Sequence, residues 1–211
     1  GGSAITATFS PQQTFATGSS PFSVKLGDVN GDGKLDIVTA NSGNGINTAS
    51  VLLGNGNGTF LPKTDFATGT TPRSVTLGDV NGDGRLDLIT ANRNSDNASV
   101  LLGNGNGTFQ NQQTFATGVN PRSVTLGDVN GDGRLDIITA NGGSANASVL
   151  LGNGNGTFKA QATFATGNNP SSVTLGDVNG DGRLDLIAAN VNSNSASVLL
   201  GNGNGTFQGQ Q

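Results

Sequence analysis

The segment Pro121–Gly167 reads PRSVTLGDVNGDGRLDIITANGGSANASVLLGNGNGTFKAQATFATG, and close copies of it fill most of the chain. The nine-residue stretch DVNGDGRLD inside it begins at Asp128 and recurs from Asp79 and from Asp177, and a copy with Lys in place of Arg begins at Asp28. The four starts are 51, 49 and 49 residues apart (28 to 79, 79 to 128, 128 to 177). One structural unit is therefore used four times in a chain of 211 residues.

Each unit is expected to form four short strands. In the unit that begins at Pro121 they are Ser123–Val129, Asp136–Asn141, Ala147–Gly152 and Ala162–Thr166. These stretches are rich in Val, Ile, Thr or Phe and are bounded by Gly, Asn or Pro, as strands commonly are. No stretch has the apolar period of about 3.6 that indicates an amphipathic helix. The pattern and the repeat length predict an all-β protein, a β-propeller with four blades per chain, each blade a four-stranded antiparallel sheet.

The chain, 1–211, is expected to form a single propeller domain. The repeat units are about 19–69, 70–118, 119–167 and 168–211, after a leader at 1–18. The leader contains PQQTFATG, which is a fourth-strand sequence, whereas the last unit stops at QGQQ without one. We therefore expect a strand near Gln12–Thr17 to complete the last sheet and remove two exposed edges. This can happen within one chain, giving a four-bladed monomer, or between two chains, giving an eight-bladed homodimer that closes head to tail.

Composition excludes several classes of function. The net charge is −4, and 12 of the 14 acidic residues lie in the four nine-residue stretches. The sequence has no basic stripe of the kind that binds nucleic acid. No apolar run approaches the roughly 20 residues that span a bilayer. The start, GGSAITATF, lacks the features of a signal peptide, and its GGS is typical of an engineered or trimmed chain. Without His, Cys or Tyr, and with Asp sites copied identically, the protein is not expected to be an enzyme.

The nine-residue stretch carries the donors of a hard metal ion. Positions 1, 5 and 9 are Asp, position 3 is Asn, and Gly at position 6 permits a sharp turn. With the carbonyl at position 7, these oxygens select Ca²⁺ or Mg²⁺, and Ca²⁺ is favoured because Mg²⁺ demands stricter geometry. Position 12 is Thr or Ala, so the loop is not an EF-hand. The alternative is that Asp and Asn form side-chain turns and bind nothing.

The stretch GDVNGDGRLDLITAN, followed by SVLLGNGNGTF, resembles the FG-GAP and VCBS repeats of integrin-type β-propellers. The resemblance covers nearly the whole chain after the leader, and it implies that the loop joins the first two strands of a blade and binds one Ca²⁺. The implied ligands, with the residue at position 7 acting through its carbonyl, are Asp28, Asn30, Asp32, Lys34 and Asp36; Asp79, Asn81, Asp83, Arg85 and Asp87; Asp128, Asn130, Asp132, Arg134 and Asp136; and Asp177, Asn179, Asp181, Arg183 and Asp185. Integrin propellers have seven blades and this chain supplies four, which favours closure as a dimer.

In antiparallel blades, the calcium loop and the GNGNG turn share one face. The loop between the second and third strands and the link between blades share the other face, which holds most of the variation between units. Candidate ligand-binding residues there are Phe22, Arg73, Arg93 and Arg122; the alternative is that they are ordinary solvated loop residues.

The protein is therefore predicted to be a calcium-stabilised scaffold or interaction module. The alternative is a carbohydrate-binding, lectin-like module or a cell-adhesion module that binds a protein, although the lack of Trp and Tyr argues against a sugar site. The resemblance implies an extracellular or cell-surface location.

Overall fold

The computed structural model describes residues 11–43 and 45–211. Within these ranges the chain forms fifteen strands: β1 Pro21–Gly27, β2 Asp36–Asn41, β3 Thr48–Leu52, β4 Thr64–Ala67, β5 Pro72–Gly78, β6 Asp87–Asn92, β7 Asn97–Leu101, β8 Gln113–Ala116, β9 Pro121–Gly127, β10 Asp136–Asn141, β11 Asn146–Leu150, β12 Ala162–Ala165, β13 Pro170–Gly176, β14 Asp185–Asn190 and β15 Ser195–Leu199. They pair antiparallel in chain order, as β1–β4, β5–β8, β9–β12 and the three-stranded β13–β15. The all-β prediction, with one sheet per repeat unit, is confirmed.

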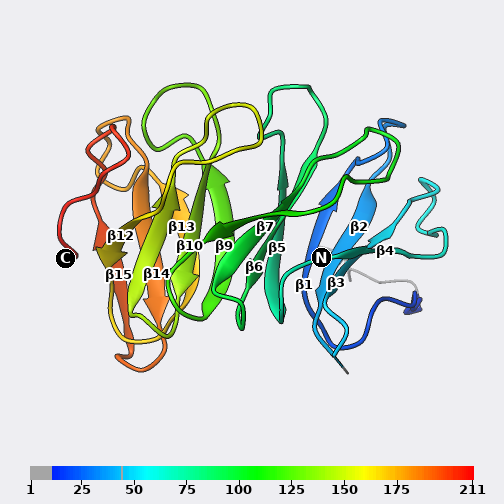
Figure 1. Cartoon of the computed structure of the whole chain (residues 1–211), viewed down its shortest axis with the longest axis horizontal. Helices are drawn as coiled ribbons and strands as arrows, with labels where there is room; N and C mark the ends of the chain where they lie inside the picture. The colour runs from blue at the N-terminus through cyan, green and yellow to red at the C-terminus, as the bar shows by residue number, and fades with distance from the viewer. Residues whose placement is uncertain (1–10, 44) are drawn as a thin grey trace, which may run out of the picture.

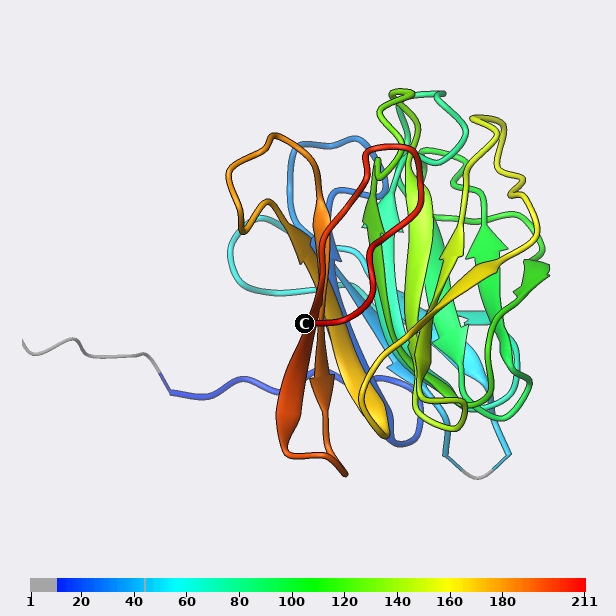
Figure 2. The same cartoon turned by 90° about the vertical axis from the view of Figure 1, so that its left-hand side faces the viewer.

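The four sheets stand side by side in an open row, with the first and last blades at opposite ends (Figure 1). Strand β1 packs on β5, β5 on β9, and β9 on β13, so the first strand of every blade is the inner strand of a propeller. From the C-terminal end, the sheet β13–β15 faces the viewer, and no other described strand covers it (Figure 2). The blades therefore do not close into a four-bladed ring within one chain.

Strand bounds differ slightly from the predicted ones. Strand β10 has the predicted bounds, but β9 begins earlier and ends earlier, because Pro121 pairs with Asn141 across a β-bulge and the loop begins at Asp128. Strand β11 stops at Leu150, and Gly152 instead forms an isolated bridge to Phe158. These are shifts of one or two residues at the ends, where strand limits are set by tertiary pairing.

In the single chain the segment Gln12–Thr17 forms no strand, so it does not close a ring within one chain, and its pairing with the last sheet of a second copy stays a prediction. The sheet that it was expected to complete lies at the other end of the row, so the segment has no strand to pair with. It still takes the position of an outer strand, because the Phe15 ring stacks edge-to-face on Phe60 at 5.1 Å, as Phe66 does on Phe109 at 5.2 Å. The first ten residues of the leader, 1–10, lie outside the described residues.

Apolar side chains from adjacent sheets form the core. Between the first two blades, for example, Val51 and Leu101 pack with Val75 and Leu88, all of them buried. Each blade also buries a polar ladder: in the third, the Asn141 side chain accepts from Thr139 and donates to Ser148. Because these buried polar groups have partners, the second strand can be buried on both faces.

Candidate metal centre and loop faces

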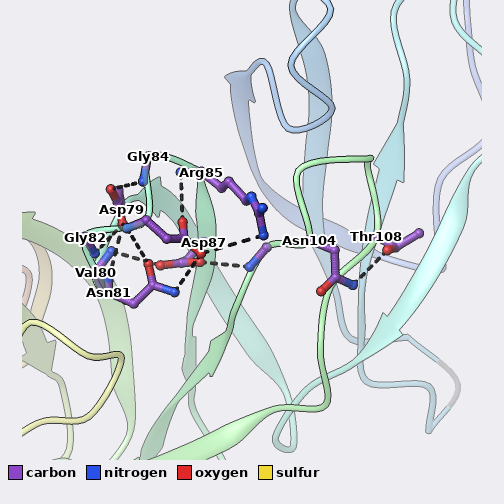
Figure 3. Close-up of polar contacts among 11 residues, drawn as sticks. Asp79, Val80, Asn81, Gly82, Gly84, Arg85, Asp87, Asn104 and Thr108 are labelled. Atoms are coloured by element: carbon purple, nitrogen blue, oxygen red, sulfur yellow. Dashed lines mark hydrogen bonds and ion pairs between the residues drawn. The ribbon is translucent and has the colours of Figure 1, made fainter.

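The nine-residue loop joins the first and second strands of each blade, as predicted. In the second blade the Asp79 carboxylate accepts from the Gly82 amide at 2.7 Å and, through its other oxygen, from the Gly84 amide at 2.8 Å (Figure 3). Gly82 and Gly84 have φ of 77° and 80°, which Gly adopts without strain. The first Asp thus closes the loop on itself, and the glycines allow the turn.

The ninth residue, Asp87, is fully buried. Its carboxylate accepts from the Val80 amide at 2.9 Å and from the Gly103 amide at 2.8 Å, so it ties the loop to the GNGNG turn. Burial raises the pKa of Asp87; the two amides lower it, and the charges of Asp83 and Asp79 raise it further. The same holds for the pKa of Asp136. The three carboxylates of a loop are therefore close enough for their charges to oppose one another.

The middle of the loop is exposed and is held by its own side chains. The Asp83 amide donates to the side-chain Oδ1 of Asn81 at 3.0 Å, and the Arg85 amide donates to the Asp83 carboxylate at 2.9 Å. The Arg85 guanidinium also lies 4.0 Å from the Asp83 carboxylate. Because these residues are solvated, such contacts hold the loop shape but contribute little to stability.

The other three loops repeat this geometry. Their first residues accept the same amides, and their ninth residues accept two amides each; the first residues are Asp28, Asp128 and Asp177, and the ninth are Asp36, Asp136 and Asp185. The structure therefore places all the predicted side chains of each set in one loop.

A ready-made cation cluster is not seen: within residues 11–43 and 45–211, no three acidic side chains converge on one point. Each carboxylate faces backbone amides instead. The donor chemistry nevertheless fits a hard cation, because every donor is an oxygen and each loop holds three carboxylates within nine residues, with the Lys or Arg at position 7 as the one cation among them.

The opposite face carries the links between blades. The loop after each second strand is hydrogen-bonded to the link that precedes its blade, as in the Arg93 amide to the Thr71 carbonyl at 2.9 Å. The structure brings Phe22, Arg73, Arg93 and Arg122 together around one cavity of about 400 Å³ on this face.

The end faces of the row were not foreseen from the sequence. Leu26 and Leu35 on the first blade, and Val178 on the last, are 57%, 59% and 56% exposed. They occupy motif positions that are half-buried or buried in the inner blades. The sequence carries no local signal for this exposure, because the repeats are nearly identical.

The repeat sequence matches the FG-GAP-like repeat family over residues 28–90, 79–139, 128–188 and 177–211. The chain therefore belongs to the FG-GAP-like repeat family, and its architecture is that of a β-propeller module. No curated protein matches it.

Three solved structures from different organisms share this architecture. A lectin of Agrocybe aegerita, described for specific recognition of non-reducing terminal N-acetylglucosamine, is 24% identical with a TM-score of 0.58; the match covers 88% of this chain and 50% of the lectin. A functionally unknown protein from Desulfotomaculum acetoxidans is 14% identical with a TM-score of 0.66, covering 92% and 56%. A Lactobacillus plantarum protein is 16% identical with a TM-score of 0.66, covering 94% and 56%.

These likenesses establish the fold. The chain spans about half the length of each of these three solved structures. Within the described ranges no helix is long and apolar enough to cross a membrane.

Proposed function

We propose that this protein is a calcium-stabilised β-propeller scaffold and interaction module that binds one Ca²⁺ in each nine-residue loop. The observation that carries the proposal is geometric: each of the four loops holds three carboxylates within nine residues, and the ninth one is fully buried, accepts only backbone amides and has no cationic partner among the described residues. In the third blade the ion would be held by Asp128, Asn130, Asp132 and Asp136, and by the carbonyl of Arg134. When bound, the ion supplies the positive charge that offsets these carboxylates.

The contacts of each loop explain why the ion should bind the folded protein in preference to the unfolded chain. The buried Asp136 carboxylate accepts from the Val129 amide within the loop and from the Gly152 amide of the GNGNG turn. An ion that contacts Asp136 and the exposed side of the loop would therefore hold the loop and the GNGNG turn together at one end of the blade. Since this geometry is absent from an unfolded chain, the ion should bind the folded form and stabilise it.

Thermal unfolding tests this. At 100 times its Kd, Ca²⁺ should stabilise the fold by about 2.7 kcal/mol for each site, so the melting temperature should fall in EGTA and recover with excess Ca²⁺. Mg²⁺ at equal concentration is the control and should recover less. An unchanged melting temperature in EGTA would refute the proposal.

We also propose that a second copy of the chain completes the ring. The two end faces are complementary in the same way as the three internal seams. At those seams a Cβ atom on Gly27, Gly78 or Gly127 would lie 2.5–2.7 Å from a leucine Cδ1 of the next blade. The equivalent Gly176 on the last blade has no atom within 4 Å of that position, whereas Leu26 and Leu35 on the first blade are uncovered. Leu26 and Leu35 of one copy would therefore fit into the open space beside Gly176 of the other copy.

Polar groups at the two end faces match as well. Within the chain the Val75, Val124 and Val173 amides donate to a serine hydroxyl of the preceding blade at 3.2–3.3 Å. The corresponding serine of the last blade is Ser172, and the corresponding amide of the first blade is that of Val24. In two chains joined head to tail, the Val24 amide of each copy would donate to the Ser172 hydroxyl of the other. The two identical seams close a C₂ ring.

The mass of the chain in solution tests this assembly. Light scattering after size exclusion should give twice the 21.0 kDa of one chain. A mass of one chain at concentrations well above micromolar would overturn it.

The face away from the nine-residue loops is the proposed ligand-binding face. The role proposed there is binding of a glycan or a protein rather than catalysis, and the proposed location is extracellular or at the cell surface, as the family resemblance implies. The cavity on this face favours binding over a purely structural role. A glycan array probed with the calcium-loaded protein tests the lectin alternative, and the absence of any bound glycan would exclude it.

A further inference from the structure

Three arginines from two adjacent blades, together with Phe22 from a third, line the cavity on the face away from the nine-residue loops. Phe22, Arg73 and Arg122 each occupy the second position of an inner strand. At this position the pairing register shifts by one residue, so each of the three is the unpaired residue of a β-bulge. A bulge turns a side chain away from the regular alternation of a strand. The repeat therefore presents one side chain per blade toward the same opening.

Neighbouring residues position the arginines. The Arg73 guanidinium lies 3.7 Å from the centre of the Phe22 ring, in a cation–π contact that crosses the seam between blades. Arg122 lies across Gly142, where a Cβ would come within 2.6 Å of the arginine Nε. The fourth unit has Ser171 and Val191 at the Arg73 and Arg93 positions, so the cluster is specific to this part of the row.

No carboxylate neutralises the cluster. All 14 acidic residues lie in the described ranges, and the ion pairs found there involve Lys34, Lys63, Arg85 and Arg134, none of which lines the cavity. The Nε atoms of the three cavity arginines are buried and have no hydrogen-bond partner among the described residues. Burial lowers the pKa of Arg73, and so do the charges of Arg93 and Arg122. Buried donors normally have partners, so this site lacks an acceptor.

We propose that this cavity binds a compact polyanion that carries two or more phosphate or sulfate groups. Guanidinium groups bind such oxyanions through paired hydrogen bonds, and three of them exceed what one monoanion can neutralise. A volume of about 400 Å³ is that of a small-molecule site and exceeds one inorganic anion. The inference deepens the proposed ligand-binding role of this face and does not require calcium.

Titration calorimetry at about 0.15 M salt tests the site with defined probes. Fructose 1,6-bisphosphate supplies two phosphates, glucosamine disulfated on N2 and O6 supplies two sulfates, and fructose and glucosamine are the controls without acidic groups. At least one of the two anionic probes should bind in a saturable manner, and fructose and glucosamine should not bind. Arg73→Gln and Arg93→Gln should each weaken binding at least about tenfold, because each removes a charged donor.

Two further variants separate a built site from general attraction to positive charge. Lys159→Gln removes one positive charge from an exposed position elsewhere and should leave binding unchanged. Gly142→Val should displace Arg122 and weaken binding as the arginine variants do. Binding that is equally weakened by Lys159→Gln, or no binding of either anionic probe by the folded protein, would overturn the proposal. Since the probes are tested with and without EGTA, failure of this site is distinguishable from failure of the calcium loops.

Discussion

The proposed ring can be blocked at a single residue without disturbing the isolated chain. Gly176 on the last blade has no positive φ, and no atom lies within 4 Å of the position that a Cβ would take there, so Gly176→Val should fold normally. In the complete ring the new side chain would meet Leu26 and Leu35 of the second copy. At the three internal seams the corresponding distance is 2.5–2.7 Å, well inside contact.

The magnitude follows from the cost of overpacking, about 1–3 kcal/mol at one seam. A C₂ ring has two identical seams, so the free energy of association should weaken by about 2 kcal/mol or more, which raises the dissociation constant at least about 30-fold. Leu26→Ala in the same chain removes the group that the valine meets and should restore part of the affinity, a coupling that a double-mutant cycle measures.

Sedimentation equilibrium over a concentration series, in saturating Ca²⁺, gives the dissociation constant for the four proteins of the cycle. Gly127→Val is the matched control, because the same change at an internal seam should lower the melting temperature of the single chain, whereas Gly176→Val should not. A dimer of unchanged affinity in Gly176→Val, or strict additivity with Leu26→Ala, would refute the reasoning.

Three other changes have defined outcomes. Asp132→Ala should remove one calcium site of four in titration calorimetry and leave the others, because each loop is built locally; loss of all four would show strong coupling. Asp136→Ala leaves two buried amides without an acceptor and should lower the unfolding free energy in EGTA by about 2–6 kcal/mol in urea titrations, whereas Asp132→Ala should lower it by less than about 1 kcal/mol. Thr71 is a β-branched residue with a φ of 59°, and Asn tolerates this left-handed conformation better. Thr71→Asn should therefore raise the unfolding free energy by about 0.5–1 kcal/mol in calorimetry, and an equal rise in Thr70→Asn would contradict this explanation.

Much of the fold follows from the sequence. The spacing of the repeat, the Gly and Asn turns, and the short Val- and Ile-rich stretches predicted one antiparallel sheet per unit, and β10 has the predicted bounds. The sequence also predicted which residues form each nine-residue loop, because the contacts that shape the loop are local. Asp79 contacts Gly82 and Gly84, and every copy carries the same residues at these positions.

What the sequence could not determine is which surfaces remain uncovered. Leu26 and Leu77 occupy the same position of the same motif, yet Leu26 is 57% exposed and Leu77 contacts the preceding blade near Gly27. The difference is made by a neighbouring blade that is present in one case and absent in the other. The segment Gln12–Thr17 reads as a strand and is none for the same reason, since a strand needs a partner edge.

The arginine cavity depends both on the sequence of the repeat and on the packing between blades. The sequence placed Arg73, Arg93 and Arg122 on the variable loop face, because strand alternation assigns loops to faces. The β-bulges at Arg73 and Arg122 and the packing angle between blades bring these two residues, about 50 positions apart in the sequence, to one opening that Arg93 also lines. The repeat sequence thus determined the blade and its loops, and the contacts between blades determined the cavity and the two open ends.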